Sequence, residues 1–339
     1  MTDRRNFIKK AAIATAGFGL IFGNNLSAAK PAIKATSGKR IGMLGLDTGH
    51  CMDFTRLFNA PDAGDKYRGY RVTAAYPEGT ELIKEWKDRI PQITKEISNE
   101  GVEIVHSIDE LLNKVDVVLM TCIDGNRHLD LATPVLKAGK PLFIDKPFAA
   151  SYKDAYAIVE AARKYGTPMF SSSSLRYICE MENVPETAGK ILGADAYGPA
   201  YIEPHHPDLF WYGIHGVEIL FAVMGTGCKS VRRVHTPKTE IVVGLWDDDR
   251  VGTFRGFRDG KYGFGATVFG KKNNVILGKD EGYSPLLVKI AEFYDTKVIP
   301  FPVEQTLEIV AFMEAADESK KQGGKEIRLE SVMINQDKS

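Results

Sequence analysis

From Lys39 onward, short apolar runs alternate with longer segments in which apolar residues recur every three or four positions. The short runs predict β-strands, and the longer segments predict amphipathic helices. The run at 115–121 is almost continuously apolar, which is typical of a strand buried on both faces of a parallel sheet. The alternation predicts a doubly wound α/β domain of the Rossmann type over residues 39–174. Strands are expected at 40–44, 71–76, 102–105, 115–121, 141–144 and 168–171, and helices at 51–58, 82–97, 109–113, 129–138 and 151–165.

The pattern changes after about residue 175. Longer β-rich runs are separated by turn sequences such as Asp247-Asp248-Asp249, which is typical of antiparallel strands. Residues 175–330 are therefore predicted to form an α+β domain on a mostly antiparallel sheet that faces a substrate or a partner, followed by a tail at 331–339. Strands are expected at 231–243, 251–258, 261–269 and 274–276, and helices at 215–224, 284–294 and 306–321.

The composition excludes several classes of protein. Of the 339 residues, 44% are hydrophobic and 26% are charged, which excludes disordered, collagenous and coiled-coil chains. The 44 basic residues balance the 44 acidic ones, so the chain lacks the positive charge that nucleic-acid binding requires. The four cysteines form no Cys-x-x-Cys pair for zinc or redox chemistry, and a disulfide stays open.

The first 29 residues have the layout of an export signal. Basic residues precede the apolar stretch 11–22, which is too short to span a bilayer comfortably, and small residues end the segment at Ala29. Arg4-Arg5-Asn6-Phe7-Ile8-Lys9 resembles the twin-arginine signal, whose pathway exports folded proteins. We expect a periplasmic or otherwise exported protein in which 30–38 is a linker, and an ordinary amphipathic N-terminus is the alternative. After removal of the signal, no stable membrane insertion is expected.

Lys146 follows the fifth predicted strand, within Asp145-Lys146-Pro147. Ligands of open α/β sheets bind beyond the carboxyl ends of the strands, so Lys146 is a candidate catalytic residue. A cation at this position polarises a carbonyl group or stabilises an alkoxide. The alternative is a solvated lysine that pairs weakly with Asp145.

The segment 203–215 carries the densest group of chemically active side chains in the second domain. Its aromatic residues offer flat faces on which a sugar ring can stack. His215 suits a general base because imidazole titrates near working pH, and a packed core histidine is the alternative. His205, His206, Asp208 and His215 are also ligand types for Zn or Mn. Adjacent histidines in an extended segment point to opposite sides, so no metal is predicted.

These motifs together resemble those of the glucose-fructose oxidoreductase, inositol dehydrogenase and MocA (Gfo/Idh/MocA) family. The resemblance rests on a glycine-bearing first turn, on 143–147, on Arg176 and on Gly213-Ile214-His215, and it covers roughly 39–330. It implies NAD or NADP as cofactor, a sugar or polyol substrate and a homo-oligomer. It also implies that Lys146 lies where cofactor and substrate meet and that His215 transfers a proton. Substrate contacts are expected from Arg176, His205, His206, Asp208, Trp211 and Tyr212.

The first turn, Gly45-Leu46-Asp47-Thr48-Gly49-His50, departs from the usual Gly-x-Gly-x-x-Gly. Asp47 replaces the second glycine, where it can cap the helix and compete with a pyrophosphate for the same amides. Similarly, Trp211 stands where many relatives carry an Asp that pairs with the histidine; Asp208, Glu218 or His206 are candidate substitutes. Cofactor contacts are expected from Gly45, Leu46, Asp47, Thr48, His50, Glu78, Asn126, His128 and Lys146.

Three functions follow from these observations. The first is an exported NAD(P)-dependent oxidoreductase that transfers hydride between a tightly bound nicotinamide and a carbon of a sugar, polyol or glycoside. The second is a glycoside-processing lyase or hydrolase that uses transient redox chemistry. The third, suggested by Asp47 and Trp211, is a non-catalytic carbohydrate-binding protein.

Overall fold

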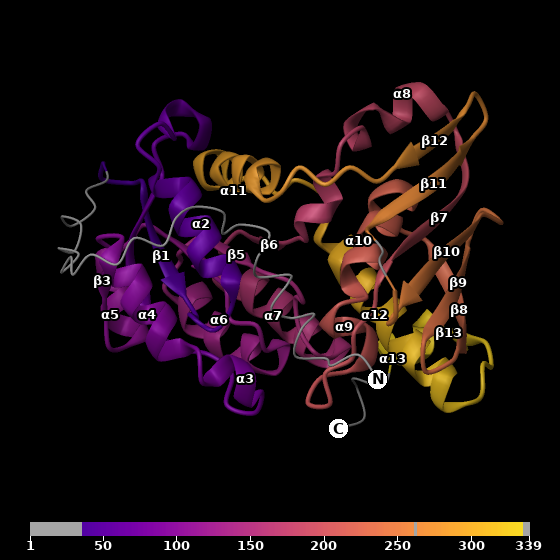
Figure 1. Cartoon of the computed structure of the whole chain (residues 1–339), viewed down its shortest axis with the longest axis horizontal. Coiled ribbons are helices and arrows are strands. Elements are labelled where there is room, and N and C mark those ends of the chain that lie inside the picture. The colour runs from indigo at the N-terminus through magenta and orange to yellow at the C-terminus, as the bar shows by residue number, and fades with distance from the viewer. Residues whose placement is uncertain (1–35, 261–262, 335–339) are drawn as a thin grey trace.

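The computed structural model describes residues 36–260 and 263–334. The predicted export signal at 1–29 and most of the predicted linker and tail lie outside the described residues. In Figure 1, the first sheet and its helices lie at the left, and the second sheet lies at the right. No helix within the described residues is long and apolar enough to cross a membrane.

The first sheet is parallel throughout and has the strand order β3-β2-β1-β4-β5-β6. The prediction of a doubly wound Rossmann domain is therefore confirmed. The strand order reverses between β1 and β4, which is where ligands bind in open sheets of this kind. The strands are β1 (Arg40–Leu44), β2 (Arg71–Tyr76), β3 (Glu103–Ile104), β4 (Val117–Met120), β5 (Leu142–Ile144) and β6 (Met169–Ser171).

Helices cover both faces of this sheet, as the doubly wound arrangement requires. Local signals fix their ends: Ser107 and Ser151 cap α5 and α7, and Gly166 ends α7 in the left-handed conformation. The predicted helix at 82–97 is divided in two, with Pro91 in the first turn of the second piece. One face carries α2 (Gly49–Asn59) and α4 (Ile90–Asn99), and the other carries α5 (Ile108–Lys114), α6 (His128–Lys137) and α7 (Tyr152–Tyr165); α3 (Lys84–Lys87) is a short turn.

The second sheet has the order β12-β11-β7-β10-β9-β8-β13, and only the pair β7–β10 is parallel. The predicted strand at 231–243 is wrong, because Pro237 lies in a turn that divides it into a hairpin. β7 was not expected, because its glycines and alanines hide the apolar alternation. The strands are β7 (Ile191–Pro199), β8 (Cys228–His235), β9 (Thr239–Trp246), β10 (Val251–Phe257), β11 (Gly265–Gly270), β12 (Asn274–Leu277) and β13 (Ile327–Arg328).

The helices of the second half do not all stay with the second sheet. α11 (Ser284–Thr296) returns to the first domain (Figure 1). There, the buried Tyr294 donates a hydrogen bond of 2.6 Å to the carbonyl of Val118. The others are α8 (Val184–Ala188), α9 (Asp208–Trp211), α10 (Ile214–Met224), α12 (Val303–Lys321) and α13 (Leu329–Ile334), and the 3₁₀ helices are η1 (Gly64–Tyr67), η2 (Gly125–Arg127), η3 (Ser174–Tyr177) and η4 (Met181–Asn183).

Candidate active site

The end of β5 places Asp145 and Lys146 at the carboxyl edge of the first sheet. The buried Asp145 carboxylate accepts hydrogen bonds from the Lys146 amide at 2.9 Å and from Nδ1 of His50 at 2.5 Å. Burial opposes ionisation of Asp145, but the positive charges of His50 and Lys146 hold its pKa below the usual range. Burial lowers the pKa of Lys146, and the charge of Asp145 opposes that shift. Lys146 is thus a half-buried cation on a turn that the hydrogen bonds of Asp145 hold in place.

His215 lies in the first turn of α10 and reaches the same site from the second domain. Its side chain is buried, and its Nδ1 is 2.6 Å from Oγ of Ser173, which follows β6. Burial, with the charges of Lys146 and His50, lowers the pKa of His215 well below its usual value. The imidazole is therefore neutral, and Nε2 is the nitrogen left for a substrate. Ser173 was not predicted, although the serine run 171–174 directly after a parallel strand is a usable signal.

Aromatic rings surround these polar groups. The Tyr212 and Phe264 rings each lie with their centroids 5.3 Å from that of His215, and the Tyr283 ring lies 4.8 Å from that of His50. Only Tyr212 among them was predicted, because Phe264 and Tyr283 come from distant parts of the chain. The site therefore offers flat apolar faces beside the polar groups of His215 and His50.

His206 is a second buried imidazole near Lys146. Its Nε2 accepts a hydrogen bond of 3.2 Å from the Gly125 amide, and its Nδ1 has no partner among the described residues. Burial lowers the pKa of His206 to about 4, and the charge of Lys146 contributes to that shift. The Trp211 ring lies 5.7 Å away, centroid to centroid. His206 thus connects the segment after β7 to the loop after β4, and the Trp211 ring lies beside it.

The first part of the turn after β1, residues 45–47, is covered by the loops after β2 and β4, because the Asp47 side chain binds both loops. The carboxylate is fully buried, with Oδ2 accepting from the Thr80 amide at 2.6 Å and Oδ1 from the Ile123 amide at 2.9 Å. Burial raises the pKa of Asp47 to about 6, against these hydrogen bonds. Gly45 has a φ of +100°, and a Cβ there would lie 2.4 Å from the Cys122 nitrogen. Gly45, Leu46 and Asp47 are therefore enclosed by neighbouring loops.

Three other residues predicted to contact the cofactor, Glu78, Asn126 and His128, instead form contacts that hold neighbouring loops in place. The Glu78 carboxylate pairs with Arg127 at 3.2 Å. Asn126 donates to Asp124 at 2.9 Å and to the His205 carbonyl at 3.3 Å. His128 is fully buried, and its two ring nitrogens face the carbonyls of Phe148 and Cys122, at 3.1 and 2.8 Å. His128 therefore ties the loop after β5 to the loop after β4.

The amino end of α2 suits a phosphate group. Thr48 caps the helix through the amide of His50, and the first turn holds no acidic residue. Gly49 is exposed, and no atom lies within 4 Å of the position that a Cβ would take. Helix amino ends attract anions through their free amides and dipole. The residues present therefore fit a nucleotide phosphate at Gly49, while a pyrophosphate that lies along the β1 turn requires Asp47 to move.

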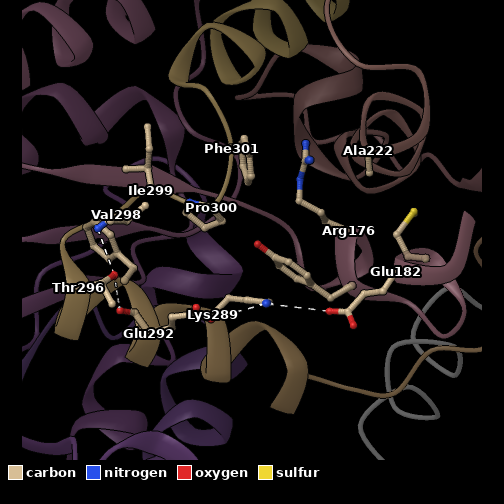
Figure 2. A pocket seen from close by; sticks show the side chains of 13 residues that line it. Arg176, Glu182, Ala222, Lys289, Glu292, Thr296, Val298, Ile299, Pro300 and Phe301 are labelled. Atoms are coloured by element: carbon tan, nitrogen blue, oxygen red, sulfur yellow. Dashed lines mark hydrogen bonds and ion pairs between the residues drawn. The ribbon is translucent and has the colours of Figure 1, made fainter. Parts of the chain in front are cut away.

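Arg176 lies outside the candidate site. Its Nε donates to the Glu218 carboxylate at 2.5 Å, and its guanidinium lies 3.8 Å from the Phe301 ring centroid. Arg176 and Phe301 line a cavity of about 420 Å³ on α11 and the loop that follows it (Figure 2). His215 and Lys146 do not line this cavity. Glu218 is occupied by Arg176 and does not act as the partner of His215.

Asp208 and His205 also point elsewhere. Asp208 pairs with Lys320 and with the buried Arg233, the latter at 3.2 Å. His205 is largely exposed and lies 3.0 Å from Glu203. Their placement as substrate contacts is not supported by this geometry. Within the described residues, no group of three or more His, Cys, Asp or Glu side chains is placed to hold a metal ion. The four cysteines are free thiols.

Solved structures share this fold at low sequence identity. The scyllo-inositol dehydrogenase of Lactobacillus casei, with NAD(H) and scyllo-inositol bound, is 13% identical with a TM-score of 0.66, covering 86% of this chain and 99% of that one. The myo-inositol 2-dehydrogenase of Lactobacillus plantarum is 13% identical with a TM-score of 0.67, covering 88% and 99%. An oxidoreductase from Agrobacterium radiobacter, in complex with NAD+, L-tartaric acid and magnesium, is 14% identical with a TM-score of 0.67, covering 87% and 100%.

No curated relative matches the chain. Residues 62–172 match the model of the Gfo/Idh/MocA family, described as an oxidoreductase family with an NAD-binding Rossmann fold. The match begins after the β1 turn that carries Asp47. The prediction of an NAD-binding oxidoreductase domain is confirmed at this level, and residues 62–172 are similar to the Rossmann domain of the Gfo/Idh/MocA family.

Proposed function

We propose that this protein is an NAD(P)-dependent oxidoreductase that acts on a hydroxyl or keto carbon of a sugar, polyol or glycoside. The observation that carries the proposal is the meeting of Lys146 and His215 at the carboxyl edge of the parallel sheet, one from each domain. The charge of Lys146 lowers the pKa of His215, so the two groups lie within electrostatic reach of each other.

The side chains divide the chemistry between a proton acceptor and an oxyanion partner. In the tautomer of neutral His215 whose Nδ1–H donates to Oγ of Ser173, Nε2 is the acceptor and takes the proton of a substrate hydroxyl. Lys146 stabilises the negative charge that develops on the substrate oxygen. Asp145 and His50 keep the Lys146 turn in place. A nicotinamide nucleotide would supply the hydride acceptor when bound; Gly49 at the amino end of α2 would hold one of its phosphates, and Lys146 would lie where the cofactor and the substrate meet.

The choice of substrate class rests on the aromatic walls. Tyr212, Phe264 and Trp211 present flat faces around the two imidazoles. Rings with alternating apolar faces and hydroxyl edges, such as inositols and pyranosides, suit such walls. Two of the similar solved structures are inositol dehydrogenases, which supports the same class.

The test is turnover of a panel of inositols, aldoses and methyl glycosides with NAD+ or NADP+, followed by nicotinamide absorbance. Wild type should reduce the nucleotide with at least one compound, whereas Lys146→Met and His215→Ala should lose that activity. His106→Ala is the matched control, because His106 is exposed and lies far in sequence from both Lys146 and His215. Equal turnover by His215→Ala and wild type would contradict the proposal.

A second function, redox-assisted elimination from a glycoside, is favoured by His206. Elimination next to a transient ketone needs a second acid–base group for the proton on the neighbouring carbon, and His206 is a second neutral imidazole near Lys146. Release of a phenol from a nitrophenyl glycoside, with no net nucleotide reduction, would identify this reaction.

A third function, non-catalytic carbohydrate binding, is favoured only by the covered β1 turn. It predicts glycan binding that survives His215→Ala.

We also propose that the protein is exported through the predicted twin-arginine signal and assembles as a homo-oligomer. Support for the assembly comes from the outer face of the second sheet, where Leu245, Val251 and Ile276 are 41%, 44% and 78% exposed. N-terminal sequencing of the protein from an exported fraction tests the signal. Light scattering of wild type and Ile276→Glu tests the interface, since a charge there should dissociate the assembly.

A further inference from the structure

Asp47 joins two loops that flank the expected nucleotide crevice. The sheet order places β1 between β2 and β4, and the Asp47 turn follows β1. Thr80 lies on the loop after β2, and Ile123 lies on the loop after β4. One carboxylate accepts the amides of both. The carboxylate therefore spans the carboxyl end of β1, along the line on which a dinucleotide lies in open sheets.

Further contacts hold the same two loops together. The Thr80 hydroxyl donates to Asp124 at 2.9 Å, and Arg127 donates to the Gly79 carbonyl at 3.1 Å. A Cβ on Gly79 would lie 2.8 Å from Oδ2 of Asp47, so the loop approaches the carboxylate as closely as only glycine permits. Thr80 is 1% exposed and Asp47 is not exposed at all. Several contacts therefore hold the loops after β2 and β4 together, and the Asp47 carboxylate lies between them.

We infer that Asp47 determines nucleotide affinity, because its carboxylate occupies the crevice that the dinucleotide pyrophosphate must enter. The inference rests on the proposed function. In the closed state, the Asp47 carboxylate accepts hydrogen bonds from the Thr80 and Ile123 amides. Nucleotide binding requires these hydrogen bonds to break and the two loops to separate. The apparent dissociation constant is then the intrinsic constant divided by the fraction of open molecules. Gly49 at the amino end of α2 stays exposed in the closed state.

Two substitutions at position 47 separate charge from bulk. Asp47→Gly restores the Gly-x-Gly spacing and releases both loops. Asp47→Asn keeps the size but has only one acceptor oxygen, so it releases one of the two amides. Asp62→Gly is the control, because Asp62 is an exposed acidic residue on the first domain, outside both loops. Dissociation constants for NAD+ and NADP+ are measured by calorimetry, and hydrogen exchange is measured on peptides that contain 78–83 and 121–127.

The expected result is nucleotide binding at least about tenfold tighter in Asp47→Gly than in wild type, with Asp47→Asn between them and Asp62→Gly unchanged. Exchange at 78–83 should be faster in ligand-free Asp47→Gly than in wild type. If wild type binds the nucleotide and Asp47→Gly binds it no more tightly, the inference is overturned and the proposed function stands. If no form binds a nucleotide, both are overturned. If Asp47→Gly does not fold, the same comparison is made with Asp47→Asn.

Discussion

Nδ1 of His50 lies 2.5 Å from Oδ2 of Asp145, and this contact joins the amino end of α2 to the end of β5. His50 occupies the position of the third glycine in the usual fingerprint, so the contact depends on the same departure that introduces Asp47. Asp145 precedes Lys146 and accepts its amide hydrogen bond. The turn expected to hold a nucleotide is therefore mechanically connected to the candidate catalytic lysine.

Replacing His50 by alanine should leave the buried Asp145 without its ring partner. We expect a loss of about 1–3 kcal/mol in the free energy of unfolding, because a buried charged acceptor then lacks a hydrogen bond. Urea unfolding at neutral pH measures the loss. His106→Ala, an exposed histidine in the same domain, should change the midpoint little. Equal midpoints for the two variants would contradict the structural role of the His50–Asp145 contact.

Ser173 should act as a positioning residue for His215. Ser173→Ala removes the 2.6 Å contact to Nδ1, and we expect kcat to fall about 10- to 100-fold because the imidazole loses its fixed orientation. The substrate KM should stay near that of wild type, since Ser173 is not placed to hold the substrate. Ser173→Thr keeps the hydroxyl and should recover most of the rate. An equal loss in both variants would show that packing, and not the hydroxyl, is what matters.

Much of the first domain could be predicted from local pattern alone. Its strands are short and apolar, and its helices end at signals such as Ser151 and Gly166, which act within a few residues. The hairpin at β8 and β9 was predicted as one strand because apolar residues continue on both sides of Pro237. The return of α11 to the first sheet depends on contacts such as Tyr294 with Val118, which no local pattern encodes.

The site residues follow the same division. Lys146 was predicted because its position after a parallel strand places it at the ligand-binding edge. Arg176 and Asp208 were predicted as substrate contacts from the family resemblance, but each has a carboxylate or cation partner from a distant segment. Asp47 was recognised as a departure, while its acceptance of the Thr80 and Ile123 amides required the structure.

His206 should make the fold sensitive to acid. Its pKa is about 4 in the folded protein, and an ordinary imidazole in the unfolded chain has a pKa of about 6.5. Between these values the unfolded chain binds a proton that the folded chain does not, so stability is lost as pH falls from about 6.5 to about 4. The loss from this group is on the order of 3 kcal/mol.

His206→Gln should remove this part of the pH dependence, because glutamine can still accept the Gly125 amide but does not titrate. Unfolding free energies of wild type and variant are compared at pH 7 and pH 5. Asp47 and Asp317 have raised pKa values, about 6 and about 7, and act in the opposite direction, but they are present in both proteins and cancel in the comparison. Parallel curves would contradict the assignment to His206.

The Arg176–Glu218 pair should be structural and not a substrate contact. Both side chains are buried, at 8% and 5% exposure, so removal of either partner leaves an uncompensated charge. Arg176→Met or Glu218→Met should each cost about 3–5 kcal/mol of unfolding free energy, while the double variant Arg176→Met/Glu218→Met should be more stable than the Arg176→Met single variant. Urea midpoints of the four proteins measure the coupling.

The kinetics of the same variants test whether Arg176 contacts the substrate. Because neither group lies against Lys146, the substrate KM of any folded variant should stay within about twofold of wild type. Loss of a direct substrate contact worth about 1.4 kcal/mol of binding would instead raise KM by tenfold or more. A raised KM with an unchanged midpoint would return Arg176 to the substrate site.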